Sequence, residues 1–235
     1  MINKEIHYIK KLIAEGEHQQ LDFKFEISDS RKIAKTLVAF ANTDGGKLLI
    51  GVKDNGNIAG VRTDEEYYMV EAAASMYCKP KVTLEFLKWT VEGKAVLEVT
   101  IARSIELPHY AEVEPNKWLA YIRVEDTNIL ASNIHLKVWK KRQQVKVIFL
   151  HFTEKEKILL KYLETNPSIS ITKFCKISMI TRKTAENILA NLITLGLIEI
   201  TFDDQHFLYV LSKEKPRNHH GFRGSCSLVS NCREI

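Results

Sequence analysis

Residues 31–52 have the sequence RKIAKTLVAFANTDGGKLLIGV, and this stretch decides the fold class of the first half of the chain. Apolar residues recur at helical spacing over 31–41, which predicts a helix with Ser30 as its N-cap. The segment 42–46 carries two adjacent glycines and is expected to end the helix and turn the chain. Residues 48–52 are nearly all apolar, as is typical of a strand buried on both faces. Helix, turn and buried strand in this order indicate a mixed α/β domain.

The sequence on either side extends this pattern. Residues 21–26 alternate apolar and charged side chains, which predicts a half-buried strand with its charged side chains in solvent. A turn of hairpin type is expected at 54–57. Other periodic segments predict two helices and three strands, at 2–15, 64–76, 82–89, 95–102 and 118–124. We therefore expect a first domain over residues 1–135, an α/β or α+β sandwich.

The second half of the chain has the element order of a small winged helix-turn-helix domain. Thr153 and Glu156 have the spacing of a capping box, which opens a first helix. A short second helix follows, and Thr181 caps a longer third one. Two strands joined by a tight turn come next, so residues 151–213 are expected to form three helices and a β-hairpin.

The charge pattern marks the boundary between the two domains. No acidic residue occurs between Asp126 and Glu154, and we interpret the basic stretch 136–150 as a linker. Residues 214–235 are polar and patternless, which predicts a disordered tail. The 34 basic and 29 acidic side chains give a formal net charge of +5, which is compatible with binding a polyanion but does not demonstrate it.

Several classes of function lack their signatures. The four cysteines include no C-x-x-C pair, so neither a zinc site nor a disulfide framework is expected. No apolar run approaches membrane-spanning length, and we predict a cytoplasmic protein with no membrane partner. The glycines around Gly46 fit neither the P-loop nor the dinucleotide-binding motif, so no nucleotide cofactor is expected.

A set of motifs resembles one known family over residues 10–130. The motifs are Glu17-x-x-x-x-Asp22-Phe23-Lys24, then AFANTDGG at 39–46, LIGV-x-D-x-G at 49–56, Gly60-Val61 and Tyr121-Ile122-Arg123. Together they resemble the Schlafen-type Alba-like domain, which was once described as a divergent AAA-type ATP-binding domain. Bacterial members often carry a C-terminal winged helix and are commonly called transcriptional regulators. The resemblance implies nucleic-acid binding, and we expect a transcriptional regulator for which DNA is favoured over RNA.

The same resemblance implies a rival function, a metal-dependent ribonuclease. In nuclease-active Schlafen proteins three carboxylates bind the metal, and by motif they correspond to Glu17, Asp22 and Asp54, with Mg²⁺ or Mn²⁺ as the cofactor. Lys24, on the same strand face as Asp22, would steady the developing charge. Asp22 stands where the family mostly has Glu, which shortens the side chain by roughly 1.5 Å, one C–C bond. The alternatives are a solvated strand face for Asp22 and Lys24, and a turn cap for Asp54.

Candidate nucleic-acid contacts are basic or amide side chains in both domains. They are Lys24, Arg31, Lys35, Arg123, Lys140, Lys141, Arg142, Arg182, Lys183 and Asn187. In the predicted winged helix, the exposed face of helix 181–195 would enter the major groove. Glu186 on that face and Asp203 and Asp204 in the wing would repel phosphate. A solvated surface is an equal alternative for the basic linker, and a protein-interaction module without nucleic-acid activity is the third alternative for the whole chain. A homodimer is expected, because winged-helix regulators usually form two-fold symmetric dimers.

Overall fold

The computed structural model describes residues 2–61, 63–144, 153–203 and 206–213, and of residues 2–6 it describes the backbone. The chain divides into two compact units, with the division between Gln144 and Val145. The predicted tail and the second half of the predicted linker lie outside the described residues. Within those residues, no helix combines the length and the apolar character needed to cross a membrane.

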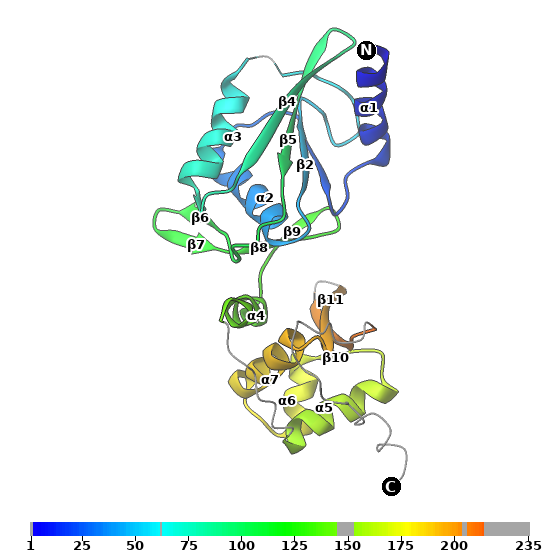
Figure 1. The fold of residues 1–235 in the computed structure, drawn as a ribbon, viewed down its shortest axis with the longest axis vertical. Helices are drawn as coiled ribbons and strands as arrows, with labels where there is room; N and C mark the ends of the chain where they lie inside the picture. The colour runs from blue at the N-terminus through cyan, green and yellow to red at the C-terminus, as the bar shows by residue number, and fades with distance from the viewer. Residues whose placement is uncertain (1, 62, 145–152, 204–205, 214–235) are drawn as a thin grey trace, which may run out of the picture. The chain divides into compact units, whose positions relative to one another are not determined.

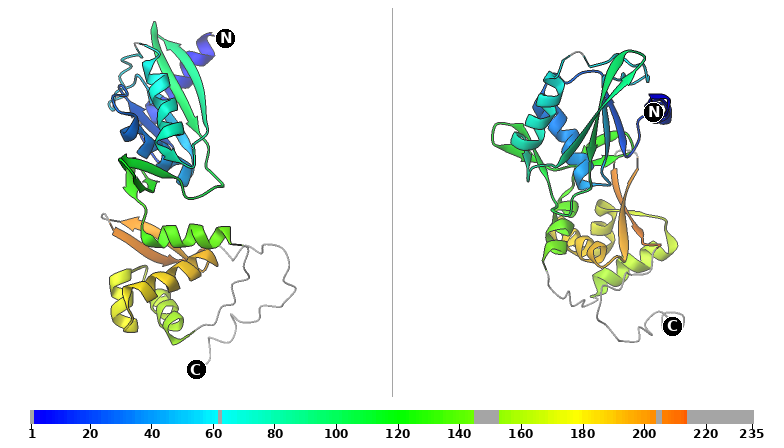
Figure 2. Two further views of the ribbon diagram at one scale, coloured as in Figure 1. Left: turned by 90° about the vertical axis from the view of Figure 1, so that its left-hand side faces the viewer. Right: turned by 45° about the horizontal axis from the view of Figure 1, so that its top comes forward.

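Unit 1 is built on a four-stranded sheet with helices on both faces (Figures 1 and 2). The strand order is β1-β2-β5-β4, in which β1 runs parallel to β2 and the other pairs are antiparallel. Its strands are β1 (Leu21–Lys24), β2 (Gly46–Ile50), β4 (Leu84–Val91) and β5 (Lys94–Ile101). Helix α1 (Ile2–Glu15) lies on one face, while α2 (Ser30–Asn42) and α3 (Glu65–Met76) lie on the other. The helices predicted at 2–15, 31–41 and 64–76 and the strands predicted at 82–89 and 95–102 are confirmed, whereas the strand predicted at 118–124 is divided at Ala120 into two strands of different sheets.

Two apolar cores lie on the two faces of this sheet. Because successive strand residues point to opposite faces, Leu48 and Val99 join the core under α2 and α3, whereas Leu49 joins the core under α1. Phe40 of α2 and Ile9 of α1 are fully buried in these two cores. Strand β2 is therefore buried on both faces, as its continuous apolar sequence predicts.

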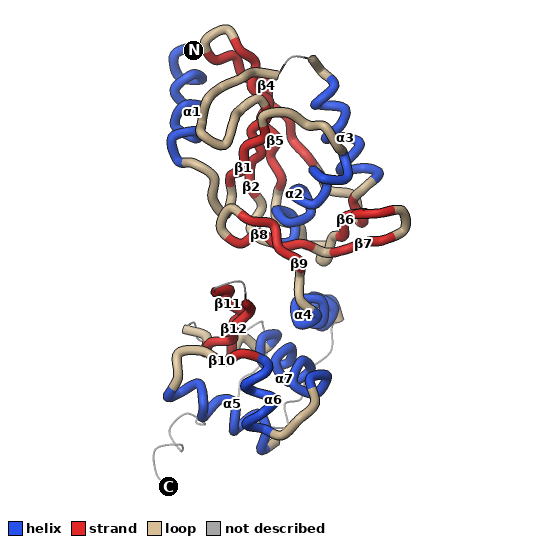
Figure 3. The backbone as a smooth tube through the Cα atoms, turned by 180° about the vertical axis from the view of Figure 1, so that it is seen from behind, coloured by secondary structure: helices blue, strands red, loops and turns tan. Residues whose placement is uncertain are grey.

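Smaller strands extend unit 1 beyond the end of the sheet. They are β3 (Cys78–Lys79), β6 (Tyr110–Glu114) and β7 (Lys117–Leu119), which form a second sheet, and the hairpin of β8 (Tyr121–Val124) with β9 (Thr127–Leu130). Helix α2 packs against β6 and β8, so both hairpins lie near it (Figure 3). These strands bring side chains from separate segments of the chain to the surface around α2.

The two glycines after α2 are required by close packing. Gly45 has a φ of +69°, and a Cβ atom there would lie 2.7 Å from the carbonyl oxygen of Ile101. At Gly46 a Cβ atom would lie 2.8 Å from the carbonyl oxygen of Gln20. Only glycine lets the chain turn into β2 between these backbone segments. The Gly-Gly pair is thus a feature of the fold, and a phosphate-binding role is not needed to explain it.

Two details of the predicted elements are wrong. The N-cap of α2 is Asp29, whose Oδ1 accepts hydrogen bonds from the backbone N–H groups of Arg31 (2.8 Å) and Lys32 (3.3 Å). Ser30 instead donates a hydrogen bond of 3.0 Å to the carbonyl oxygen of Met69 and so ties α2 to α3. The longer carboxylate one residue earlier reaches two free N–H groups, which explains why Asp29 is the cap.

Strand β1 also departs from the predicted alternation. It ends at Lys24, and Phe25, predicted to face the core, is 40% exposed. Asp22, predicted to face solvent, is only 2% exposed. The face that carries Asp22 is covered by strand β8, which supplies a guanidinium to the carboxylate, as described below.

The predicted linker differs from the structure in its first half. Residues 136–143 belong to helix α4 (Asn133–Gln143), the last element of unit 1. The Ser132 side chain caps this helix, and Lys140, Lys141 and Arg142 occupy its last turn, where cations interact favourably with the helix dipole. Residues 145–150 of the predicted linker, which include Lys146, lie outside the described residues.

Within its described residues, unit 2 contains three helices and a small antiparallel sheet, and the helices and the hairpin follow in the order that the sequence predicts. The elements are α5 (Glu154–Thr165), β10 (Ile169–Ser170), α6 (Ile171–Ser178), α7 (Arg182–Thr194), β11 (Ile198–Asp203) and β12 (His206–Leu211). The sheet has the strand order β10-β12-β11. Thr153 caps α5 in a capping box with Glu156, and Thr181 caps α7, as predicted.

Candidate nucleic-acid interface

Asp22 on β1 and Arg123 on β8 form a buried ion pair. Arg123 Nη2 lies 3.1 Å from Asp22 Oδ1, and the side chains of Asp22 and Arg123 are 3% and 1% exposed, respectively. The same guanidinium donates to the carbonyl oxygen of Leu21 and, through Nη1, to Oδ1 of Asn128. It also lies over the ring of Phe40, 5.1 Å from its centre. Arg123 therefore joins β1, α2 and the β8–β9 hairpin.

Lys24 and Glu17 surround the other oxygen of Asp22. Lys24 Nζ lies 2.8 Å from Asp22 Oδ2 and 4.0 Å from Glu17 Oε1, and it donates to the carbonyl oxygen of Phe23. Glu17 Oε1 accepts a hydrogen bond of 2.8 Å from the backbone N–H of Phe23. Partial burial, reinforced by the adjacent Asp22 carboxylate, raises the pKa of Glu17. Lys24 is thus held inside this cluster by its own strand.

The three carboxylates proposed for metal binding are not gathered. Asp54 lies exposed in the turn that the hydrogen bond from Lys53 N to Asn57 O closes. In the ranges that the structure describes, no group of three His, Cys, Asp or Glu side chains is placed to hold a metal ion. Both oxygens of Asp22 already face cations, Arg123 and Lys24. This donor set does not fit Mg²⁺ or Mn²⁺, which need converging free oxygens.

The burial of Arg123 also corrects its predicted contact with nucleic acid. A guanidinium that is 1% exposed, and paired with a carboxylate, has no face to offer a phosphate group. Asp22 is buried, so the alternative interpretation of a solvated strand face does not hold for it either. We therefore treat this pair as structural.

Arg31 and Lys35 of α2 lie in a surface where cations cover aromatic rings. Arg31 Cζ lies 5.1 Å from the ring centre of Tyr77, and Lys35 Nζ lies 5.9 Å from that of Tyr121. A third pair adds Lys79, whose Nζ is 6.0 Å from the ring of Trp118. The three rings are half-buried. We name these six residues the α2 surface. Figure 3 shows α2, β7 and β8, which carry Arg31, Lys35, Trp118 and Tyr121.

Acidic side chains partly offset the charge of the α2 surface. Glu112 Oε2 lies 3.8 Å from Arg31 Nε, and Glu114 pairs with Lys117 at 2.9 Å. The positive charge of Lys117 also reaches Tyr121, whose pKa is raised by burial and lowered to a lesser extent by Lys117. Three cations against aromatic rings match single-stranded nucleic acid, in which phosphates seek cations and bases stack on rings.

Sequence reasoning found Arg31 and Lys35 but missed their aromatic partners. Tyr77, Trp118 and Tyr121 come from three segments that only the fold brings to α2. The single local signal was the adjacent pair Lys117-Trp118, in which a cation and a ring alternate along a strand.

In unit 2, the N-terminal half of α7 presents its polar side chains to solvent. Arg182, Lys183, Thr184 and Asn187 are exposed, and the side chain of Arg182 is 71% exposed. Glu186, expected on this face, is 7% exposed, and its Oε1 lies 3.5 Å from Arg182 Nε. The one acidic residue on this part of the helix is therefore turned toward the interior.

The basic end of α4 lies close to another arginine of unit 1. Partial burial, followed by the positive charge of Arg103, lowers the pKa of Arg142. Lys140 lies exposed in the last turn of the same helix.

Comparison with known families agrees with this architecture. Residues 17–132 match the family model described as Schlafen, AlbA_2. The match covers most of unit 1 and just under half of the chain, and the mixed α and β structure of unit 1 is consistent with an AlbA_2-type domain. The family suggests a nucleic-acid-related domain. The Schlafen-type resemblance inferred from the motifs is thus supported for unit 1.

Two solved structures match parts of the chain. The DIP2311 protein of Corynebacterium diphtheriae is 18% identical with a TM-score of 0.46, and the match covers 88% of this chain but only 38% of that protein. The N-terminal domain of a Nitrosomonas europaea protein described as related to the ATP-dependent DNA helicase RecG is 22% identical with a TM-score of 0.37. That match covers 62% of this chain and 97% of the domain. No curated protein shows significant similarity to the chain.

Proposed function

We propose that this protein is a transcriptional regulator that binds duplex DNA through α7 of unit 2, used as the recognition helix of a winged helix-turn-helix domain. The observation that carries the proposal is the exposed polar N-terminal half of α7. Recognition helices contact base edges with their N-terminal residues, and arginine and asparagine match guanine and adenine there. Arg182, Lys183 and Asn187 are the side chains assigned to this contact.

The electrostatics of unit 2 support this assignment. Glu186 is withdrawn into an ion pair with Arg182, which removes the nearest carboxylate from the path of the DNA backbone. Arg182 and Lys183 occupy the first turn of α7, where the positive end of the helix dipole adds to their attraction for phosphate. The α2 surface of unit 1 would add contacts to phosphates and to unpaired bases.

The test is duplex-DNA binding by the full chain, measured by fluorescence anisotropy over a range of salt concentrations. Replacing Arg182 and Lys183 with alanine is expected to weaken binding about tenfold or more and to lower the salt slope by about two. The matched control is Lys157→Ala with Lys161→Ala, which removes the same charge from exposed positions on α5. Equal affinity in both double variants would overturn the role of α7.

Dimerisation forms part of the same proposal. Winged-helix regulators bind two half-sites one helical turn apart through a two-fold dimer. Sedimentation equilibrium at micromolar concentration is expected to give twice the mass of the chain, which is 27.0 kDa. A mass of one chain at all concentrations would contradict a dimer and leave monomeric binding to a single half-site.

A further inference from the structure

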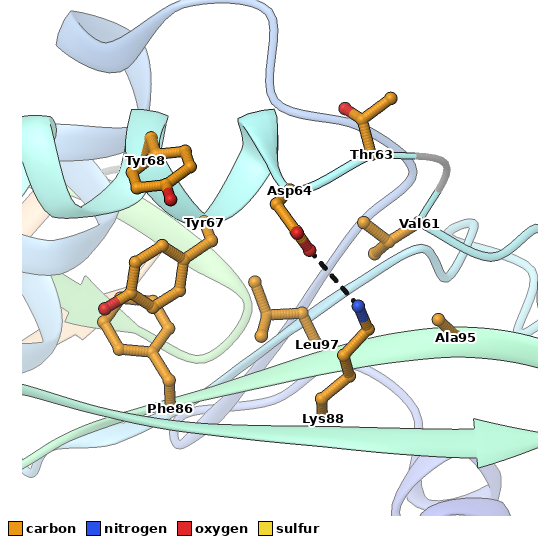
Figure 4. A pocket seen from close by; sticks show the side chains of 9 residues that line it. All are labelled: Val61, Thr63, Asp64, Tyr67, Tyr68, Phe86, Lys88, Ala95 and Leu97. Carbon is orange, nitrogen blue, oxygen red and sulfur yellow. Dashed lines mark hydrogen bonds and ion pairs between the residues drawn. The ribbon is translucent and has the colours of Figure 1, made fainter.

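A pocket of about 300 Å³ opens in unit 1 between helix α3 and strands β4 and β5 (Figure 4). None of its lining residues belongs to α7, to the α2 surface or to the Glu17–Asp22 cluster. Pockets for small molecules range from about 300 to 1,000 Å³ and combine apolar walls with a few polar groups. This pocket lies at the lower end of that range, which suits one small ring system.

One wall of the pocket is aromatic. The ring centres of Tyr67 on α3 and Phe86 on β4 lie 4.4 Å apart, and Tyr68 packs edge-on against Tyr67 at 5.4 Å. Leu97 and Val61 also line the pocket, and Figure 4 shows Leu97 between the aromatic wall and the Asp64–Lys88 pair. A flat aromatic ligand gains most from such a wall, because it stacks on the rings while its edge stays free for hydrogen bonds.

The opposite side carries one carboxylate and one ammonium group. Lys88 Nζ lies 3.2 Å from Asp64 Oδ1, and the two side chains are 61% and 76% exposed. A carboxylate only accepts hydrogen bonds and an ammonium group only donates them. An exposed ion pair of this kind adds little to stability, so both groups are available to a ligand at small cost. The ligand edge that fits presents adjacent donors beside an acceptor.

The described residues near the start of α3 include more acidic than basic groups. Asp64, Glu65 and Glu66 stand at the start of α3, and they already occupy the positive end of its dipole. Lys88 offsets one of these three negative charges, and Lys94 donates a hydrogen bond to the carbonyl oxygen of Ile58. Among the described residues, Asp64 and Lys88 are therefore the charged side chains that line the pocket.

We propose that this pocket binds the guanine base. Guanine carries two adjacent donors, N1–H and the N2 amino group, next to the acceptor O6. With the base stacked on the Tyr67–Phe86 wall, the Asp64 carboxylate accepts from both donors and Lys88 donates to O6. Adenine presents its acceptor N1 at the place where guanine has N1–H, and this acceptor would face the carboxylate. The proposal does not rest on DNA binding by α7.

The experiment titrates the full chain with guanosine, inosine and adenosine and follows binding by saturation-transfer NMR and calorimetry. Guanosine is expected to bind about tenfold more tightly than inosine, which lacks the N2 amino group, and adenosine more weakly still. Asp64→Asn is expected to weaken guanosine binding by at least about tenfold, because one hydrogen-bond acceptor becomes a donor. Glu65→Gln, which removes the same charge one residue away and outside the pocket, leaves the affinity unchanged.

Phe86→Leu provides an independent test of the stacking wall, with an expected loss of about tenfold in guanosine affinity. Circular dichroism of each variant verifies that unit 1 stays folded. Equal binding of the three nucleosides, or guanosine binding that survives Asp64→Asn, overturns the proposal, as does the absence of binding by wild type.

A second arm distinguishes the source of the base. An oligothymidylate strand with one guanine is compared with the same strand without it. If the guanine increases the affinity for the strand and Asp64→Asn abolishes this increase, the pocket binds guanine in unpaired strands. If guanosine binds but the guanine does not increase the affinity for the strand, the pocket binds the free nucleoside. Arg182→Ala with Lys183→Ala keeps guanosine affinity if the proposal holds, so failure of DNA binding by α7 is distinguishable from failure of the pocket.

Discussion

Nε1 of Trp89 donates a hydrogen bond of 2.7 Å to Oε2 of Glu98, whose side chain is completely buried at the centre of the sheet of unit 1. The other carboxylate oxygen accepts from Lys47 Nζ and, at 2.9 Å, from the hydroxyl group of Tyr8 on α1. Three donors from β2, β4 and α1 thus satisfy one buried carboxylate. Such a fully bonded network holds α1 on the sheet, whereas a partly bonded one would cost stability.

This network predicts that unit 1 loses stability at alkaline pH. Burial is the main cause that raises the pKa of Tyr8 above 10.0. Partial burial lowers the pKa of Lys47, but its bonds to Glu98 and Tyr8 outweigh that effect and raise it above 10.5 overall. Between the unfolded and the folded pKa the folded state binds more protons, so stability is present below about pH 10 and falls as pH rises.

Urea unfolding at pH 9 and pH 11 measures this loss. In Lys47→Met with Tyr8→Phe, the decrease between the two pH values is expected to be smaller than in wild type. Lys11→Met, which removes an exposed lysine of α1, serves as the control and keeps the wild-type decrease. An identical decrease in all three proteins would contradict the assignment.

The pair of Asp22 and Arg123 predicts strong coupling between two distant positions. Arg123→Ala is expected to lower the free energy of unfolding by about 3–5 kcal/mol, because it leaves the Asp22 carboxylate buried without its main partner. The double variant Asp22→Ala with Arg123→Ala is expected to cost less than the sum of the two single variants. A double-mutant cycle from urea unfolding gives the coupling energy. Strictly additive effects would mean that the pair contributes no interaction of its own.

The Gly45 turn predicts a sharp difference between two glycines of similar backbone conformation. Gly45→Ala is expected to cost roughly 1–3 kcal/mol, because a Cβ atom would meet the backbone of Ile101 and Arg103 at a positive φ. At Gly93, where φ is +76°, an added Cβ atom would meet no heavy atom within 4 Å. The loss of stability in Gly93→Ala therefore comes only from the positive φ. Thermal unfolding compares the two variants, and equal costs would leave the close approach at Gly45 without energetic effect.

The fold of unit 1 follows from local patterns more closely than its polar interior does. Apolar spacing located α2 and a continuous apolar run located β2, because both patterns belong to the sequence itself. The burial of Asp22 escaped this reasoning, since its partner Arg123 lies 101 positions along the chain, and alternation along β1 favoured solvent for the carboxylate. Only the packing of the β8–β9 hairpin against the rest of the unit reveals that this face is covered.

The candidate sites divide in the same way. The exposed contacts on α7 were predictable from helical spacing, although the inward turn of Glu186 was not. The α2 surface and the pocket under α3 were both invisible in the sequence, because each gathers residues from three or more separate segments. Convergence of this kind depends on the tertiary fold, which single-sequence periodicity does not encode.

His135 in α4 predicts a loss of stability in acid. Burial lowers its pKa from 6.5 to about 4, and its Nδ1 accepts from the backbone N–H of Ser132 in the capping box. Between these two values the unfolded chain binds the extra proton, so stability is present above pH 6.5 and is lost as pH falls toward 4. An NMR titration of the His135 ring is expected to show its midpoint near 4. A midpoint near 6.5 would mean that the ring is solvated.

The α2 surface predicts a measurable contribution to binding of single strands. Arg31→Ala with Lys35→Ala removes two cations that lie over Tyr77 and Tyr121, and it is expected to reduce the slope of log affinity against log salt by about 1.4 for a single-stranded oligonucleotide. Trp118→Leu is expected to weaken the same complex without changing the slope, because a stacking ring releases no counterions. Lys10→Ala with Lys11→Ala removes equal charge from exposed positions on α1 and is expected to leave both quantities unchanged. If the two double variants shift the slope equally, the charge of unit 1 acts only through long-range attraction, and the α2 surface makes no direct contact with the strand.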